Sequence, residues 1–252
     1  MINIQNENLA NYVMFKLNKI ENAFTEQELA TIEELVVNPV DIINESTPIN
    51  LEVLTFFVGL KNLELANLYI SNTDIQNLNG LKMLKSIVFE GCVFENFEAV
   101  QTLNVNHLSI INCKQNIDCV YNIKHLQSLT VLNNNIYISK LNGLTNLTYL
   151  QISHTNIIDK VDIKLQNLQE LYIDGTNILN LEFVKGLTNL KRLSLSQDQI
   201  DNNVELVKSL IKKGVVVMLE NMVDLKVMEV GHDWLYLQTK NRQPRWRKNT
   251  KT

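Results

Sequence analysis

The sequence contains few of the residues on which most catalytic and metal sites depend. It has three cysteines and four histidines in 252 residues. Cys92, Cys113 and Cys119 are separated by 21 and 6 residues, which fits neither a CxxC redox motif nor a zinc site. Three cysteines cannot all pair, so they favour a reducing compartment. We expect no bound metal.

Nucleotide-binding, metalloprotease and calcium-binding motifs are also missing. The sequence has no GxGxxG or GxxxxGK[ST] loop, no HExxH and no EF-hand loop. His107, His125, His154 and His232 fall in different segments, and no serine or cysteine nucleophile is placed beside them by the repeat described below. The sequence therefore predicts a protein that is not an enzyme, with no catalytic residues and no cofactor.

No stretch approaches the ~20 apolar residues that a membrane-spanning helix needs. The first residues, Met1 to Asn8, lack the basic region and apolar region of a signal peptide. Together with the cysteines, this predicts a cytoplasmic protein. Secretion is the alternative if a leader has been removed.

Charge is unevenly distributed along the chain. Residues 1–233 carry 17 basic and 27 acidic side chains, whereas residues 234–252 carry six basic side chains and no acidic one. A basic end containing tryptophan can bind nucleic acid or an anionic membrane, or it can be a solvated, disordered terminus. We favour the second interpretation. Binding of nucleic acid or an anionic membrane would use Lys240, Arg242, Arg245, Trp246, Arg247 and Lys248.

A repeat of 21 to 22 residues organises most of the chain. The segment Leu144 to Ile157 aligns with Leu165 to Ile178 on the pattern LxxLxxLxLxxTxI. Each LxL unit predicts a short strand whose aliphatic side chains point into the core, because strand side chains alternate. The strand-opening residues are Leu68, Ile87, Leu108, Leu129, Leu150, Leu171 and Leu193, at intervals of 19, 21, 21, 21, 21 and 22.

One such repeat cannot bury its own apolar face, so neighbouring repeats must stack. The pattern predicts an α/β leucine-rich-repeat solenoid over residues 35–219, curved, with a parallel sheet on its concave face. The chain leaves each strand three residues after the second aliphatic residue of the LxL unit. At this position we expect small side chains that can form hydrogen bonds with the backbone. They are Thr73, Cys92, Cys113, Asn134, Thr155, Thr176 and Asp198.

Helices are expected to cap the first repeat, over residues 1–34. Apolar residues recur at helical spacing from 8 to 20, ending at Ile20, and Thr25 with Glu28 has the form of a capping box that starts a second helix. The interval of 33 between Leu35 and Leu68 predicts a loop insertion near 44–48, with Leu63-x-Leu65 as an alternative strand.

The other end is expected to be closed by residues 220–252. A helix over 202–213 and a strand over 215–219 precede two alternating segments, 223–227 and 234–238, which predict a hairpin. We expect the cap, solenoid and hairpin to form a single folded unit.

The segments Leu9–Leu17 (LANYVMFKL) and Phe24–Leu35 (FTEQELATIEEL), followed by these repeats, resemble the opening of bacterial internalin-type leucine-rich-repeat proteins. The resemblance covers about residues 8–219. It implies an exported protein that interacts with a host, although this chain shows neither a signal peptide nor a C-terminal sorting pattern.

Outward-facing strand positions are the candidates for partner binding. Val88, Ile111 and Leu132 place apolar side chains on three consecutive strands. Clustered apolar and aromatic side chains are typical of binding hot spots, although single exposed aliphatics are common, and nearby carboxylates favour a partner with basic groups. The predicted partner-binding residues are Tyr69, Val88, Glu90, His107, Ile111, Leu132, Tyr149, Gln151, Glu170, Tyr172, Asp174 and Arg192.

The sequence therefore predicts a non-enzymatic scaffold that binds a partner protein on its concave sheet. Two alternatives are binding of nucleic acid or anionic membrane through the basic end, and an exported, internalin-like host-interaction protein.

Overall fold

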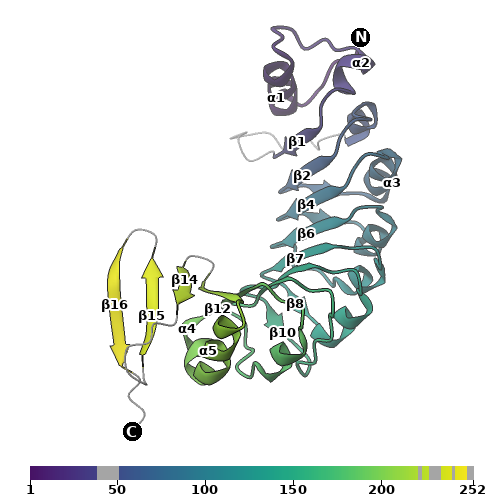
Figure 1. The fold of residues 1–252 in the computed structure, drawn as a ribbon. Coiled ribbons are helices and arrows are strands. Elements are labelled where there is room, and N and C mark those ends of the chain that lie inside the picture. Colours follow the sequence, from purple (N-terminus) through teal and green to yellow (C-terminus); the bar gives the residue numbers. More distant parts are fainter. Residues whose placement is uncertain (39–50, 221–222, 227–233, 240–241, 249–252) are drawn as a thin grey trace. The chain divides into compact units, whose positions relative to one another are not determined.

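The computed structural model describes residues 1–38, 51–220, 223–226, 234–239 and 242–248. They form two compact units, Met1–Thr130 (unit 1) and Val131–Thr252 (unit 2). Figure 1 gives the labels of the helices and strands.

Unit 1 opens with two helices. Helix α1 (Glu7–Leu17) begins at Asn6, whose side chain accepts from the Leu9 amide, and ends at Asn18, which has a left-handed backbone (φ 53°). The predicted helix is therefore confirmed but shorter, and Ile20 is 97% exposed rather than part of its apolar face. Helix α2 (Glu26–Leu29) is a single turn that starts with the predicted capping box.

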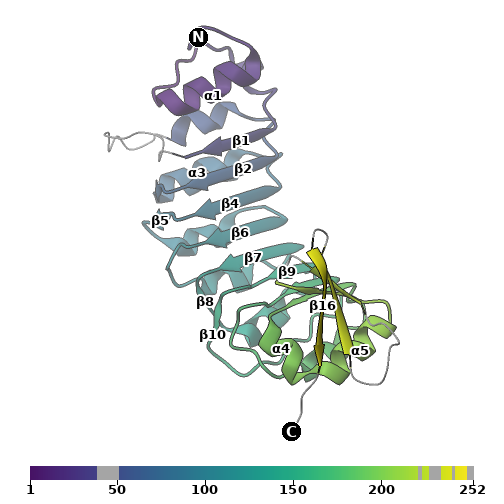
Figure 2. The ribbon, with the colours of Figure 1, turned by 90° about the vertical axis from the view of Figure 1, so that its left-hand side faces the viewer.

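Parallel strands follow, one in each repeat of unit 1. They are β1 (Glu34–Val37), β2 (Asn62–Ala66), β4 (Ser86–Glu90) and β6 (His107–Ile111). Figure 2 faces the sheet that they form, with α3 behind it. The segments behind the sheet are η2 (Leu51–Phe56), α3 (Asn72–Gly80), η3 (Phe97–Thr102) and η4 (Asp118–Asn122), with β3 (Tyr69–Ile70) and β5 (Val93–Phe94) paired as a separate two-stranded sheet.

The predicted opening residue of the second strand was wrong. Leu63, and not Leu68, lies between Leu35 and Ile87 in the parallel register, so the alternative strand Leu63-x-Leu65 is confirmed. The strand ends at Ala66, and the backbone of Asn67 after it is left-handed (φ 55°). The repeat is longer than its neighbours because α3 is a nine-residue helix. Tyr69 consequently belongs to β3 and Thr73 to α3, so neither has its predicted position in the main sheet.

Strands β2, β4 and β6 each end before a left-handed residue, and after β4 and β6 the next residue is a side-chain donor. Asn67, Gly91 and Asn112 have φ between 55° and 60°, values that favour glycine and asparagine. The thiol of Cys92 donates to the Leu65 carbonyl at 3.1 Å, and that of Cys113 donates to the Phe89 carbonyl at 3.4 Å. A side chain of one repeat thus satisfies the last buried carbonyl of the preceding strand.

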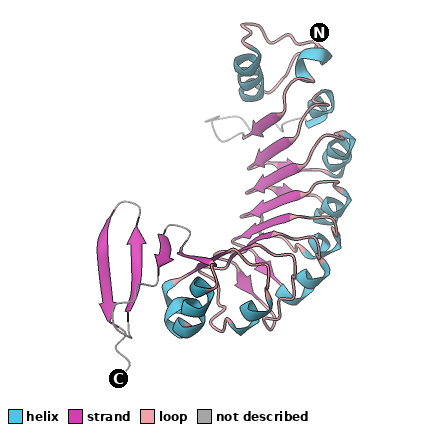
Figure 3. Cartoon of the chain, in the orientation of Figure 1, coloured by secondary structure: helices cyan, strands magenta, loops and turns pink. Residues whose placement is uncertain are grey.

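Unit 2 continues the repeat after β7 (Ser128–Leu132), which spans the boundary between the units. Strands β9 (Tyr149–Gln151), β11 (Glu170–Tyr172), β12 (Arg192–Leu195) and β13 (Val216–Leu219) are parallel. The other elements, coloured by type in Figure 3, are β8 (Asn135–Ile136), η5 (Ile138–Gly143), β10 (Asn156–Ile157), η6 (Glu182–Gly186), α4 (Gln197–Asn202) and α5 (Val204–Lys212).

Among the strand exits of unit 2, Thr155 follows this rule. The Thr155 hydroxyl donates to the Val131 carbonyl at 2.8 Å. The Asn134 amide donates to the Leu132 carbonyl and the Thr176 hydroxyl donates to the Ile173 carbonyl, each within its own repeat. In the last repeat the predicted Asp198 is exposed, and Gln199 is fully buried in its place. Its amide donates to the carbonyls of Ile173 and Ile178 and to the Thr176 hydroxyl. The prediction failed here because Ser196 starts helix α4, which rotates the next residues.

The end of the chain is antiparallel. Strands β14 (Val223–Lys226), β15 (Trp234–Thr239) and β16 (Arg242–Lys248) follow β13 in order, which confirms the predicted hairpin. Because 242–248 form a strand, the interpretation of a disordered basic end was wrong for these residues. Lys240 lies outside the described residues.

All three cysteines are unpaired and buried. Burial raises the pKa of the Cys92 and Cys119 thiols to about 11, and it also raises the pKa of Cys113. The thiolate is the reactive form, and at pH 8 a thiol of pKa 11 is about one part in a thousand ionised.

We therefore expect a thiol reagent at pH 8 to leave the native protein unlabelled and to label three thiols after denaturation. Absorbance of the released chromophore counts the thiols. Rapid labelling of the folded protein would contradict this burial.

The bond from Thr155 to Val131 can be tested by Thr155→Val, which keeps the shape of the side chain and removes the donor. The buried carbonyl would lose its partner, so the free energy of unfolding should fall by about 1–3 kcal/mol. Urea titration measures the change. Thr155→Ser, which keeps the hydroxyl, is the control and should remain more stable than Thr155→Val.

Candidate functional site

The outward side chains of β1, β2, β4 and β6 form a surface that we call the unit 1 face. It lies on the side of the sheet that Figure 2 presents to the reader. Its three rows across the strands are Glu34, Asn62, Ser86 and His107; Val36, Glu64, Val88 and Ser109; and Ala66, Glu90 and Ile111.

Apolar and acidic side chains alternate on the unit 1 face. Val36 is 43% exposed, and Val88 and Ile111 are partly exposed, at positions where a solvent-facing strand usually carries polar residues. Glu64, which the wrong register had excluded, stands between Val36 and Val88, and Glu90 stands beside Ile111. His107 is exposed at one edge.

Unit 2 has its own outward face on β9, β11 and β12, which we call the unit 2 face. Its centre is a pair of tyrosines, Tyr149 and Tyr172, with ring centroids 5.2 Å apart and an interplanar angle of 40°. The Tyr149 hydroxyl donates to Gln151 and the Tyr172 hydroxyl donates to Glu170, each at 2.7 Å. Leu132, at the end of β7, is partly exposed.

Two predicted contact residues of the unit 2 face are buried. Tyr172 is 9% exposed and Asp174 is 2% exposed, so the expectation that they are open to a partner was wrong. Burial, and then the hydrogen bond to Glu170, raise the pKa of Tyr172 to about 12, so its hydroxyl stays a donor at neutral pH. Exposed Arg192 approaches Glu170 at 3.8 Å.

Asp174 is held by neighbours from the preceding repeat. Its carboxylate accepts from the Ser153 hydroxyl at 3.0 Å and lies 3.9 Å from Nε2 of His154. His154 has a left-handed backbone (φ 55°), and its ring lies against Gly175, where a Cβ would be 2.3 Å from Nδ1. Ser153 donates to the carboxylate and not to the imidazole, so the three residues do not form a nucleophile with its base.

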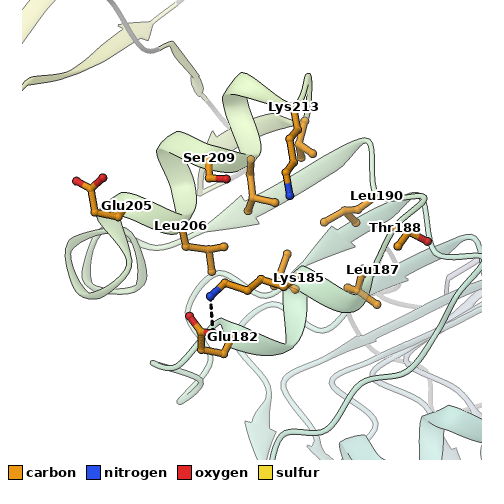
Figure 4. A pocket seen from close by; sticks show the side chains of 12 residues that line it. Glu182, Lys185, Leu187, Thr188, Leu190, Glu205, Leu206, Ser209 and Lys213 are labelled. Atoms are coloured by element: carbon orange, nitrogen blue, oxygen red, sulfur yellow. Dashed lines mark hydrogen bonds and ion pairs between the residues drawn. The ribbon is translucent and has the colours of Figure 1, made fainter.

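A groove of about 620 Å³ lies between η6 and α5 in unit 2. Figure 4 shows Leu187, Leu190 and Leu206 lining it, and Lys185 paired with Glu182 at 2.6 Å. This groove was not predicted from the sequence. The amphipathic helix predicted over 202–213 was the available signal, because its apolar side must pack on the preceding repeat.

The part of the chain that the structure describes contains no group of three metal-ligating side chains able to hold an ion. Its helices include none long and apolar enough to cross a membrane. His107, His125 and His154 are exposed, and His232 lies outside the described residues.

No protein-family model and no curated protein matches the sequence. Solved structures do match. Internalin C2 of Listeria monocytogenes aligns over 86% of this chain and 94% of its own, with a TM-score of 0.59 and 24% identity. An internalin-like protein of the same organism, lmo2027, aligns over 77% of this chain and 61% of its own, with a TM-score of 0.51 and 18% identity.

A chain of the TLR13–ssRNA13 complex aligns over 78% of this chain and 30% of its own, with a TM-score of 0.57 and 14% identity. This chain has the leucine-rich-repeat fold. The predicted fold class and the predicted likeness to internalin structures are confirmed, and at these identities the likeness concerns the fold. Leucine-rich-repeat folds present extended surfaces, typical of protein-interaction scaffolds in general.

The contact between His154 and Gly175 can be tested in this leucine-rich-repeat chain by Gly175→Ala. Alanine at φ 68° is strained, and its Cβ would collide with the imidazole, so we expect a loss of about 1–3 kcal/mol of unfolding free energy.

In the background of His154→Ala the collision is absent and only the backbone strain remains, so the loss caused by Gly175→Ala should shrink. Thermal and urea unfolding of the four proteins complete the cycle. An equal loss in both backgrounds would show that the ring does not constrain Gly175.

Proposed function

We propose that this protein is a non-enzymatic interaction scaffold that binds a partner protein through the outward faces of its parallel strands. The observation that carries the proposal is the exposed apolar content of the unit 1 face, in Val36, Val88 and Ile111. Burying each such side chain against a partner would contribute about 1.5–3 kcal/mol. Val88 and Ile111 lie on strands that pair with a neighbour on each side, which holds these side chains in place and lowers the entropy lost on binding.

The unit 2 face supports the same function by a different means. Tyr149 is partly exposed and is held by its ring contact with Tyr172 and its hydrogen bond to Gln151. Tyrosine fixed in this way offers a partner apolar area together with a polar group. The buried Tyr172 and Asp174 would then act as supports for the partly exposed Tyr149, Gln151 and Glu170.

Nucleic-acid binding by the unit 1 face is disfavoured by its charge. RNA is the ligand in the complex of TLR13, whose fold is similar. The unit 1 face, however, carries Glu34, Glu64 and Glu90 and no lysine or arginine, so it would repel a phosphate backbone. Nucleic-acid binding through the basic residues of 240–252 is a separate alternative, and deletion of these residues tests it.

We further propose that the protein works in the cytoplasm, because its three thiols are buried and unpaired. Fractionation of the native cells should find it with a cytoplasmic marker. Recovery from the culture supernatant with secreted proteins would favour the exported alternative.

The scaffold function predicts that polar substitution of the outward faces removes a partner. The full chain and the variant Val88→Asn, Ile111→Asn, Leu132→Asn would be used to capture proteins from native lysate, with mass spectrometry of what is retained. Asparagine adds no charge, so steering by charge is unchanged. We expect a partner that binds the full chain and binds the variant at least about tenfold more weakly by calorimetry.

Matched controls are Val93→Asn, Ile158→Asn and Leu179→Asn, which replace residues 55%, 46% and 53% exposed outside the main parallel strands. They should retain the partner. Unchanged affinity of every partner for the outward-face variant would overturn the proposal. Loss of nuclease-sensitive material only on deletion of residues 240–252 would assign binding to the basic end.

A further inference from the structure

We propose that the unit 1 face binds a basic, amphipathic protein segment, whose lysine or arginine side chains pair with Glu64 and Glu90 while its aliphatic side chains pack on Val88 and Ile111. The inference rests on the proposed scaffold function and adds the chemistry of the partner.

Carboxylates and aliphatic side chains lie next to one another in two rows of the unit 1 face. In the middle row Glu64 lies in register between Val36 and Val88, and in the next row Glu90 lies between Ala66 and Ile111. Neighbouring strands are about 4.8 Å apart, so each carboxylate has an apolar side chain within one strand spacing on either side. A segment that packs on the aliphatic residues must therefore meet the carboxylates as well.

Within the described residues, no positively charged or hydrogen-bonding side chain contacts the carboxylates of Glu64 and Glu90. Glu64 and Glu90 are both partly buried, and neither carboxylate has a hydrogen-bond or ion-pair partner there. Glu33 and Glu34 differ, because Glu33 pairs with Lys61 at 2.6 Å and Glu34 accepts from Asn62 at 3.1 Å.

Repulsion between the two carboxylates makes a cationic partner favourable. Glu64 and Glu90 are diagonal neighbours on adjacent strands, about 8 Å apart by the spacing and rise of parallel strands, which is comparable with the Debye length of about 8 Å at physiological salt. Like charges at this spacing oppose each other, and a cation placed between them would remove that repulsion.

The same features define the type of ligand. A lysine or arginine covers apolar surface with its stem while its charged end reaches a carboxylate, which fits alternating valine and glutamate. Glu64 lies on β2 and Glu90 lies on β4 at a different register position, so the two carboxylates are not gathered around one point as the ligands of a metal ion are. The occupant should therefore be an extended or helical segment with several cations and aliphatic residues.

The test uses the full chain and a fluorescent 16-residue peptide of alternating lysine and leucine pairs. Two companion peptides replace every lysine by glutamate or every leucine by serine. Fluorescence anisotropy at physiological salt should show that the basic amphipathic peptide binds at least about tenfold more tightly than either companion, because both parts of the face contribute.

The protein variant Glu64→Gln, Glu90→Gln should weaken binding of the basic peptide about tenfold. Its control is Glu21→Gln, Glu98→Gln, which changes the net charge equally at exposed glutamates outside the face and should bind within about twofold of the natural protein. Equal weakening by both variants, or equal binding of the acidic peptide, would overturn the inference. Tight binding only after deletion of residues 240–252 would assign the face to the chain's own basic end and would also overturn it.

One result would contradict the binding of a basic segment without contradicting the scaffold function. A lysate partner that is lost with the asparagine variant but retained in full by Glu64→Gln, Glu90→Gln would leave the scaffold function in place and remove the requirement for a basic segment.

Discussion

A hydrogen bond from a strand-exit side chain to a carbonyl of the preceding strand joins neighbouring repeats at three of the described strand exits. The chain must turn out of each strand while its last buried carbonyl still needs a donor. Cys92, Cys113 and Thr155 supply that donor with a thiol or hydroxyl, and a left-handed residue before each of them aims it backward. This bond adds to the backbone pairing that sets the register of the strands and thereby positions the outward faces.

Much of this arrangement could be predicted from the sequence, because a parallel register repeats each requirement at a fixed interval. The strand positions from Ile87 to Leu193, the capping box at Thr25 and the final hairpin were all predicted. The second strand was misplaced since Leu63-Glu-Leu65 and Leu68-Tyr-Ile70 have the same alternation. The choice between them depends on the length of α3, which hydrophobic periodicity does not measure.

The candidate site was less predictable for a related reason. Alternation identifies which side of a strand a residue faces, and it placed Val88 and Ile111 correctly on the unit 1 face. It does not show how far neighbouring side chains cover a residue. Tyr172 is covered in part by the ring of Tyr149, and Asp174 is buried beside Ser153 and His154, so both are closed to a partner despite facing outward.

Gln199 has a consequence for how a protein of this kind can grow. Its amide donates to three acceptors of the preceding repeat, two of them carbonyls, where a threonine or cysteine of an ordinary repeat serves fewer. The helix that positions it directs the chain away from the repeating path. Duplication of the repeat that carries Thr155 would preserve its hydroxyl donor to the preceding strand, whereas duplication of the last repeat would place this terminal amide in the interior of the array. The ancestry of such a chain should therefore record insertions before Leu193 and an unaltered final repeat.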